Sequence, residues 1–363
     1  MIPIIKVRMP PREQLMPALE QILYSGMIGE GDEVYAFERE FAERFGLPNA
    51  LGMSSGTGAL HVALLACGMQ PGDEVITTSM TAEPTNTTIL QIGARPVFAD
   101  VDPATGNLDP AAVERAITPA TRGICVVHYA GYPADMRRLR DIADRHGIAL
   151  IEDCAHALGA RIDGVPIGTI GDAAIFSFQA IKHMTSVDGG VLSLRDPARL
   201  DLARRLRWFG LRKGVPRTEV DITTPGFKYN MNNVTAVVGR QQLATIDEAI
   251  KRHIDNGRFF DRAFAGIAGV APARVDAGSE PSYWLYTLLC DDAAAVEAAL
   301  VAEGITASKL HRPNHLHSVF APYALHMPGL ATFYDRLLHL PCGWWVDDAD
   351  RERIVAIVER AAR

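Results

Sequence analysis

Lys182 has the setting most suggestive of chemistry in this 363-residue chain. It follows the apolar run 174–176, lies among small and apolar residues, and precedes the glycine pair 189–190. Apolar surroundings lower the pKa of a lysine because they disfavour the ammonium form. The neutral amine can then attack a carbonyl carbon and form a Schiff base. The alternative interpretation is a surface lysine near the end of a strand.

Asp153 is a second candidate, and it follows the apolar run 148–151. A carboxylate at a strand end can pair with a protonated heterocyclic nitrogen and so keep an electron-withdrawing ring charged. His156 lies three residues further on. Taken alone, Asp153 is better explained as a loop cap and His156 as an ordinary loop histidine. Because ligands collect at the carboxyl ends of parallel strands, we expect Asp153 and the segment after residue 176 at the same sheet edge.

A third candidate is the segment 54–60, which reads Ser-Ser-Gly-Thr-Gly-Ala-Leu and leads into an amphipathic helix. Free N–H groups and the helix dipole make such a terminus suitable for a phosphate. The alternative is a Ser or Thr N-cap with glycines for a tight turn. A dinucleotide-binding loop is disfavoured, because His61 replaces the third glycine and no strand is predicted before the turn. The Gly-Lys-Ser/Thr ending of a Walker loop is also missing.

Short buried strands must position these groups. Apolar runs bounded by polar, Gly or Pro residues predict strands, and helical patterns between them predict helices at 110–117 and 136–146. This alternation predicts an α/β core with a mainly parallel central sheet flanked by helices. The predicted strands are 75–78, 96–99, 124–127, 148–151, 174–176 and 190–194.

Beyond about residue 233 the pattern changes, and we predict a smaller C-terminal α+β domain. We place a large domain at residues 1–240 and the small one at 241–363, with about the first 25 residues forming an arm or packing on the small domain. The elements predicted in this part are helices at 234–258, 293–303 and 348–362 and a strand at 283–289.

The composition narrows the class of protein. The 36 Lys+Arg against 43 Asp+Glu give a net charge of −7, and no basic run suggests binding to nucleic acid. With 48% hydrophobic and 22% charged residues the chain is not intrinsically disordered. No apolar stretch nears the roughly 20 residues of a membrane helix, and no signal peptide begins the chain, so we expect a cytoplasmic protein. Five scattered cysteines without a C-x-x-C pair indicate neither disulfides nor zinc.

In this order and spacing, the three candidate segments resemble the DegT/DnrJ/StrS-type sugar aminotransferases, which are pyridoxal 5′-phosphate (PLP) enzymes of fold type I. The resemblance covers nearly the whole chain. It implies that Lys182 forms the Schiff base with PLP and later moves a proton between substrate and cofactor. Further segments that carry the resemblance are 37–42, 72–76 and 96–102.

By the same resemblance, Asp153 pairs with the ring nitrogen of PLP and His156 lies near its phenolic oxygen. PLP needs a nucleophilic amine, an acid beside its ring nitrogen and a phosphate site, and these residue types supply all three. The residues expected to bind the phosphate are Gly56, Thr57 and Ser177.

The chain departs from the family pattern at two places. Ala82 falls where the family usually has an aromatic residue over the PLP ring. Lys228 lies in a segment whose asparagine, in the family, reaches the phosphate in the partner subunit. We predict that Lys228 pairs with that phosphate as a point charge, with a surface lysine as the alternative. The family also implies a homodimer with the active site at the subunit interface.

The resemblance implies ping-pong transfer of an amino group from L-glutamate, through pyridoxamine phosphate, to a 3- or 4-keto-sugar on a nucleoside diphosphate. The alternatives are transamination of a small phosphorylated ketone, or a catalytically silent regulatory protein of the same fold. Dehydration at C3 of a keto-sugar is disfavoured, because related dehydratases replace the lysine. No metal is expected, since Pro313 interrupts the histidine cluster at 311–317. The residues expected to contact substrate are Arg207, Arg212, His311 and Arg312.

Overall fold

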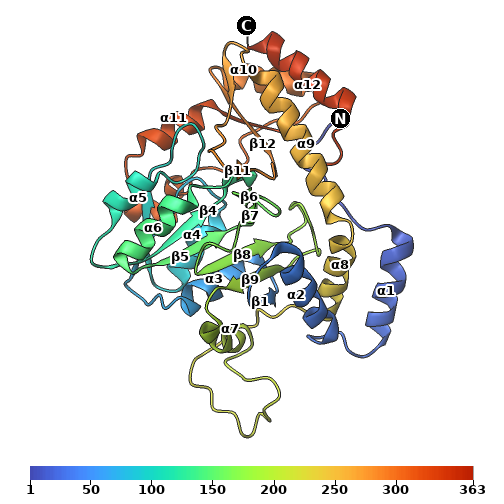
Figure 1. Cartoon of the computed structure of the whole chain (residues 1–363), viewed down its shortest axis with the longest axis vertical. Coiled ribbons are helices and arrows are strands. Elements are labelled where there is room, and N and C mark those ends of the chain that lie inside the picture. Colours follow the sequence, from blue (N-terminus) through green and yellow to red (C-terminus); the bar gives the residue numbers. More distant parts are fainter. Residues whose placement is uncertain (363) are drawn as a thin grey trace.

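The computed structural model describes residues 1–362 and has a seven-stranded sheet at its centre (Figure 1). Its strands are β1 (Ala50–Met53), β2 (Glu74–Thr78), β3 (Arg95–Ala99), β4 (Thr121–Val127), β5 (Ala149–Asp153), β8 (Ala173–Ser177) and β9 (Gly190–Leu194). They lie in the order β1-β9-β8-β5-β4-β2-β3, and of these seven strands only β9 runs in the direction opposite to the other six. The predicted α/β fold with a mainly parallel sheet is confirmed.

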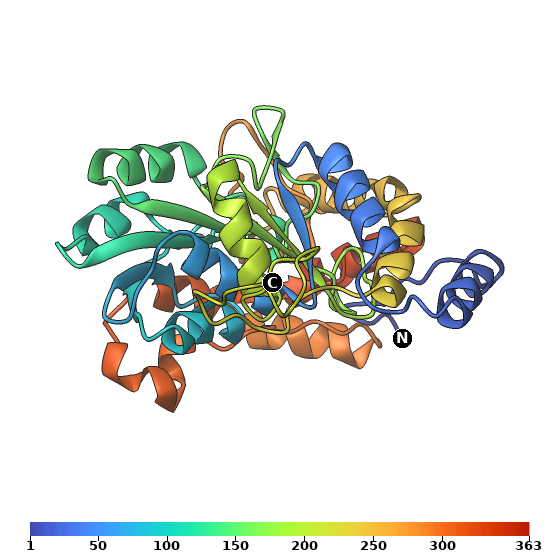
Figure 2. The ribbon, with the colours of Figure 1, turned by 90° about the horizontal axis from the view of Figure 1, so that it is seen from below.

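Helices cover both faces of this sheet (Figure 2). They are α2 (Asp32–Phe45), α3 (Gly56–Ala66), α4 (Glu83–Gln91), α5 (Pro110–Ala116), α6 (Met136–His146), α7 (Leu200–Arg207) and α8 (Asn233–Leu243). Neighbouring residues of a strand point to opposite faces, so a central strand needs apolar side chains on both. In β5, Leu150 packs in the apolar cluster of α2, α5 and α6, whereas Ile151 packs in that of α3, α4 and α7.

The C-terminal part has its own three-stranded antiparallel sheet, in the order β10-β12-β13, and a separate apolar core. Its elements are α9 (Ile246–Phe264), β10 (Val270–Pro272), β12 (Tyr286–Cys290), α10 (Ala293–Ala302), α11 (Pro328–Arg336), β13 (Leu337–Leu340) and α12 (Asp348–Ala361). This composition agrees with the predicted α+β character, and the domain boundary at residue 240 stays a prediction.

Several small elements complete the fold. A three-stranded sheet of two-residue strands joins the two parts, because β11 comes from the C-terminal part and pairs with β6. These elements are β6 (Arg161–Ile162), β7 (Val165–Pro166), β11 (Ser279–Glu280) and the 3₁₀ helices η1 (Tyr129–Gly131), η2 (Pro197–Arg199), η3 (Asn314–Leu316) and η4 (Ser318–Tyr323).

Three local predictions were wrong. The turn at 54–58 does follow a strand, β1, which pairs with β9 about 140 residues later in the chain. The single helix predicted at 234–258 is two helices, because the chain leaves helical geometry at Thr245 (φ −131°). The strand predicted from residue 283 begins at Tyr286, because Ser282 and Leu285 donate backbone hydrogen bonds to Gly131 and Ala130 instead.

The N-terminal segment packs along the C-terminal part. Ile2 forms a β-bridge with Ile305, and Trp345 Nε1 donates a hydrogen bond of 2.8 Å to the Pro3 carbonyl oxygen. Helix α1 (Arg12–Tyr24) then lies against α8. Among the described residues, no helix is both long enough and apolar enough to span a membrane.

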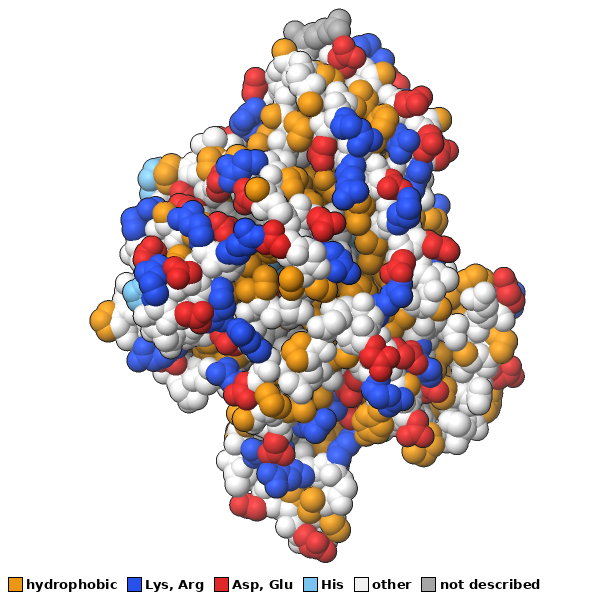
Figure 3. Space-filling view, in the orientation of Figure 1, with side chains coloured by type: hydrophobic (Ala, Val, Ile, Leu, Met, Phe, Trp, Pro, Cys, Tyr) orange, Lys and Arg blue, Asp and Glu red, His pale blue; other side chains and the backbone are white. Residues whose placement is uncertain are grey.

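The loop between α7 and α8, residues 208–232, projects from the body of the molecule (Figure 1) and forms a separate lobe at the bottom of the space-filling view (Figure 3). It carries exposed apolar side chains, Phe209, Val215 and Ile222, as well as Arg212 and Lys228. This loop therefore presents both apolar and basic groups to a potential partner.

Val187, between Lys182 and β9, has a strained backbone. Its φ is +76°, and its side chain is 64% exposed. An L-residue in this left-handed region pays roughly 1–2 kcal/mol, whereas glycine adopts it freely. After subtraction of the extra entropy that glycine has in the unfolded chain, Val187→Gly should raise the free energy of unfolding by about 0.5–1 kcal/mol.

Denaturant titration of Val187→Gly tests this expectation. Val275→Gly is the matched control, since Val275 is also exposed and its φ is not positive. That control should lower stability. A Val187→Gly protein that is less stable than the original would contradict the assigned strain.

Candidate active site

A pocket of roughly 360 Å³ opens at the carboxyl ends of the central strands. Asp153 ends β5 and Ser177 ends β8, so the parallel sheet brings both to the same edge. The pocket is lined by Ser55, Gly56, Thr57, Leu60, Thr81, Ala82, Glu83, Pro84, Thr85, Val127, Asp153, Ala155, His156, Ile175, Ser177, Gln179, Ile181, Lys182, Asp188 and His311.

Lys182 lies on the loop between β8 and β9 and lines the pocket. The surrounding protein desolvates its amine and lowers its pKa to about 8, while the negative charge of Asp153 acts in the opposite direction. At pH 7 about a tenth of this amine is therefore unprotonated. The structure thus gives Lys182 the nucleophilic amine that its sequence setting predicted.

Both carboxylate oxygens of Asp153 have partners. Oδ2 accepts a 2.8 Å hydrogen bond from Thr85 Oγ1, and Oδ1 accepts one of 3.1 Å from the Ala155 backbone N–H. Burial raises the pKa of Asp153, and these hydrogen bonds and the charge of Lys182 only partly offset that effect. A cationic ring nitrogen beside the carboxylate would favour its ionised form.

The N-terminus of α3 lines the pocket. Ser55 Oγ accepts a 3.0 Å hydrogen bond from the Gly58 N–H and caps the helix, as its sequence predicted. A Cβ on Gly56 would lie 2.8 Å from the Cβ of Ser177, so only glycine lets the two segments approach this closely. Thr57 and Ser177 line the same pocket. Free N–H groups and the helix dipole there favour an anion.

Two histidines stand beside Lys182. His156 and His311 lie parallel, with ring centroids 5.5 Å apart. His156 Nδ1 and His311 Nε2 are buried and have no hydrogen-bond partner among the described residues. Burial lowers the pKa of His156 well below its usual value and that of His311 to about 4, with the charge of Lys182 acting in the same direction. Both rings are therefore neutral at neutral pH.

This donor set fits PLP. The amine of Lys182 could bond to the aldehyde carbon of PLP, the carboxylate of Asp153 could pair with its ring nitrogen, and the N-terminus of α3 could hold its phosphate. The orphaned Nδ1 of His156 can hydrogen-bond a phenolic oxygen. Ala82 lines the pocket, and the only aromatic rings among the described lining residues are the imidazoles of His156 and His311.

The sequence profile of the DegT/DnrJ/EryC1/StrS aminotransferase family matches residues 11–359. The chain belongs to this family. It is 33% identical to the spore coat polysaccharide biosynthesis protein SpsC of Bacillus subtilis, over 96% of this chain and 94% of that protein.

Two solved structures of sugar aminotransferases are similar over almost their whole length. The sugar aminotransferase CalS13 from Micromonospora echinospora is 36% identical with a TM-score of 0.96, over 99% of this chain and 100% of that one. The putative sugar aminotransferase Spr1654 from Streptococcus pneumoniae, in its PLP form, is 26% identical with a TM-score of 0.90, over 99% and 98%. The same Spr1654 protein is also known in a PMP form.

Not every residue that the family resemblance suggested lies in the pocket. Arg207 is buried, and its guanidinium donates to Glu30 Oε1 (2.8 Å), Glu38 Oε1 (2.7 Å) and the Gly52 carbonyl oxygen (2.8 Å). It thus joins α7 to α2 and β1. Two carboxylates already neutralise the charge of Arg207 inside its own chain, which gives it a structural role, and its contact with substrate stays a prediction.

The other predicted basic residues lie outside the pocket of their own chain. Arg212 is exposed and donates a 3.0 Å hydrogen bond to Asp201 Oδ2. Arg312 is exposed and does not line the pocket. The Lys228 amine lies 4.4 Å from the ring centroid of Trp208 and donates a 2.6 Å hydrogen bond to Asn230 Oδ1. A role for these residues in this family member therefore depends on a second subunit or on bound substrate.

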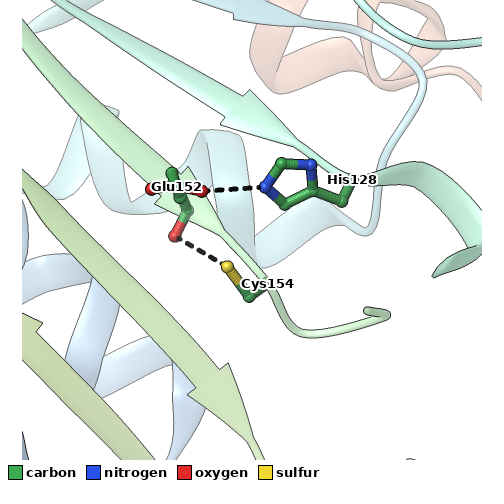
Figure 4. Close-up of side chains that lie close together, drawn as sticks. All are labelled: His128, Glu152 and Cys154. Atoms are coloured by element: carbon green, nitrogen blue, oxygen red, sulfur yellow. Dashed lines mark hydrogen bonds and ion pairs between the residues drawn. The ribbon is translucent and has the colours of Figure 1, made fainter. Parts of the chain in front are cut away.

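His128, Glu152 and Cys154 form a buried cluster of residue types that can bind metals, on either side of Asp153 in the sequence (Figure 4). His128 Nδ1 accepts the Ala134 backbone N–H (3.1 Å), so its Nε2 carries the proton that is donated to Glu152 Oε2 (3.2 Å). The Glu152 carboxylate also accepts the backbone N–H groups of residues 168, 170 and 171. Burial raises its pKa, but these hydrogen bonds outweigh burial and lower it. The cluster holds the loop at 168–171, and its hydrogen bonds occupy both ring nitrogens of His128 and both carboxylate oxygens of Glu152.

Three residues of the site escaped sequence reasoning. Thr85 and Thr81 form a hydroxyl chain to Asp153, with a 2.9 Å contact between their oxygens. Trp284 comes from the C-terminal part and lies against Lys182 and His156. The Thr-rich run 77–88 offered a signal for the first two, whereas nothing in the sequence places residue 284 beside residue 182.

Proposed function

We propose that this sugar aminotransferase moves the amino group of L-glutamate to a keto-sugar carried on a nucleoside diphosphate, with PLP as cofactor. The observation that carries the proposal is one pocket that unites the Lys182 amine, the Asp153 carboxylate and the N-terminus of α3. When bound, PLP supplies a ring that accepts electrons from the substrate carbon as that carbon loses its proton.

The chain's own residues divide the work. The amine of Lys182 is available in its unprotonated form. When it is not bonded to the cofactor, it would take a proton from the substrate Cα and return it to the C4′ carbon of PLP. Asp153, oriented by Thr85, keeps the ring nitrogen protonated. Gly56, Thr57 and Ser177 hold the phosphate, and His156 Nδ1 meets the phenolic oxygen.

The lining of the pocket favours a hydroxyl-rich acceptor. No arginine is among the described lining residues, whereas an acceptor with two carboxylates calls for such a guanidinium. Gln179, Glu83 and the orphaned Nε2 of His311 instead offer hydrogen bonds suited to sugar hydroxyls. With Ala82 in place of a large ring, the site has room for a sugar.

We further propose a homodimer in which each projecting loop serves the other subunit's pocket. Apolar side chains are exposed on this loop and at the end of α1, such as Ile222 (52%), Tyr24 (86%) and Met27 (65%). Exposed apolar groups of this kind mark contact surfaces. Lys228 would then neutralise the phosphate across the interface, and Arg212 and Arg312 would contact the pyrophosphate or the donor carboxylate.

Subunit complementation tests the shared site. Lys182→Ala and Lys228→Ala proteins should each be inactive or nearly so, whereas mixed dimers of the two should regain activity, because one of their two sites is intact. Refolded or co-expressed mixtures are assayed by 2-oxoglutarate release. Mixtures no more active than the separate variants would place Lys228 in the pocket of its own chain or outside any site.

The substrate class is tested with L-glutamate and a panel of acceptors, with products detected by mass spectrometry. The panel contains nucleoside-diphosphate 4-keto- and 3-keto-6-deoxyhexoses and small phosphorylated ketones. The proposal expects amination of a nucleotide sugar. Amination of a small phosphorylated ketone alone, or of no compound by a protein that binds PLP, would overturn it.

A further inference from the structure

Trp284 contacts both the amine and the imidazole that the proposed reaction uses. The Lys182 Nζ atom is 4.2 Å from the centroid of the indole ring. The ring of His156 stacks on the same indole, with centroids 4.0 Å apart and planes inclined by 17°. Trp284 is 2% exposed, so its indole ring is shielded from bulk solvent.

The backbone and the indole N–H of Trp284 fix its ring. Nε1 donates a 2.8 Å hydrogen bond to the carbonyl oxygen of Ile181, the residue before Lys182. The preceding residue, Tyr283, has a φ of +46°, a conformation that is costly for an aromatic residue. A Cβ on Gly131 would lie 2.6 Å from the Trp284 backbone nitrogen. The main chain at Trp284 can therefore approach the end of η1 this closely only because residue 131 is a glycine.

The charges around Lys182 leave this indole an electrostatic role. The titratable groups that face the amine are Asp153, His156, His183 and His311. Burial lowers the pKa of all three histidines, so Asp153 is the sole full charge among the described residues that attracts the ammonium form. The negative face of an indole attracts a cation as well.

We propose that Trp284 is a positioning residue, whose indole face holds the Lys182 ammonium whenever that amine is not bonded to the cofactor and whose stacking fixes the ring of His156. The inference rests on the proposed function, because only a lysine that is released and re-bonded in each cycle needs such a resting position. The proposal gives Trp284, which belongs to the C-terminal part of the chain, a role in the reaction.

The test measures the ionisation of Lys182 in full-length protein stripped of cofactor. Acetic anhydride labels neutral amines, and mass spectrometry of the Lys182 peptide gives the extent of labelling at each pH. Wild-type protein should show a midpoint near pH 8. In Trp284→Leu the ammonium form loses its indole, and the midpoint should fall by about one pH unit. Trp284→Phe, which retains a weaker ring, should fall by less.

Phe259→Leu is the matched control. Its ring also has a cation over its face, since the Arg351 Cζ atom lies 4.4 Å from the ring centroid. Loss of that contact should leave the Lys182 midpoint unchanged. A purely structural role for Trp284 would lower thermal stability without moving the midpoint.

An unmoved or raised midpoint in folded Trp284→Leu overturns the proposal. If Trp284→Leu does not fold, Trp284→Phe replaces it. A lower Lys182 midpoint in that variant supports the proposal, and an unchanged midpoint overturns it. The labelling uses no cofactor and no sugar. If no acceptor of the panel were aminated, the proposed function would be wrong but the labelling result would still hold. If the Lys182 midpoint did not move, the role of Trp284 would be wrong but the proposed function would be unaffected.

Discussion

Lys182→Ala should abolish transamination, with turnover falling roughly 10⁴-fold or more. The variant lacks the amine that bonds to the cofactor and also the group that carries the proton between two carbons. Because its pKa of about 8 makes this amine both a usable nucleophile and a usable base, no neighbouring side chain can replace it. The measurement is 2-oxoglutarate release with L-glutamate and the best acceptor of the panel.

Two further variants separate chemistry from folding. Lys182→Arg keeps a positive charge but offers no neutral amine, so it should be as inactive as Lys182→Ala. Lys251→Ala is the surface control, since Lys251 belongs to an exposed ion pair with Asp255 and should behave like wild type. Turnover by Lys182→Ala within tenfold of wild type would remove Lys182 from its assigned role.

Asp153→Asn should retain the cofactor but turn over roughly 10²–10³-fold more slowly, the range seen when one preorganised charge-stabilising group is removed. The amide keeps the size of the carboxyl group, so its hydrogen bond with Thr85 can be preserved. It cannot stabilise a protonated ring nitrogen, and a neutral ring withdraws electrons less strongly. The effect should fall on kcat, with a smaller change in the KM for glutamate.

The control for this substitution is Asp255→Asn, the other half of the surface ion pair with Lys251. It makes the same chemical change on the surface and should leave kcat unaltered. If Asp153→Asn turned over at a near-normal rate, the ring nitrogen would need another partner, and the assignment of Asp153 would be abandoned.

The sequence predicted the part of the site that belongs to the sheet. Asp153 and Lys182 were identifiable because each follows an apolar run, and parallel strands bring such positions to one edge. The turn at residues 54–58 was identifiable from its glycines and hydroxyls. These are local patterns, so the residues near each group are enough to interpret it.

The features that the sequence did not predict depend on contacts between distant segments. Trp284 contacts Lys182 although about 100 residues separate them in the chain. The positive φ of Tyr283, which precedes Trp284, is also not predictable from the local sequence. The structural role of Arg207 could not be predicted, because its two carboxylate partners, Glu30 and Glu38, lie about 170 residues earlier in the chain. Without them in view, Arg207 looked like a free guanidinium that could bind substrate. Strand β1 went unpredicted because it has four residues and pairs with β9.

The visible absorption of the purified protein, before and after L-glutamate is added, tests the central claim most directly. The protein supplied with PLP should be yellow, and L-glutamate alone should bleach that colour as the amino group passes to the cofactor. L-Glutamate should have no such effect on Lys182→Ala. A wild-type protein that stays colourless with PLP, or whose colour does not respond to any amino donor, would contradict the account and indicate a protein of this fold without transaminase chemistry.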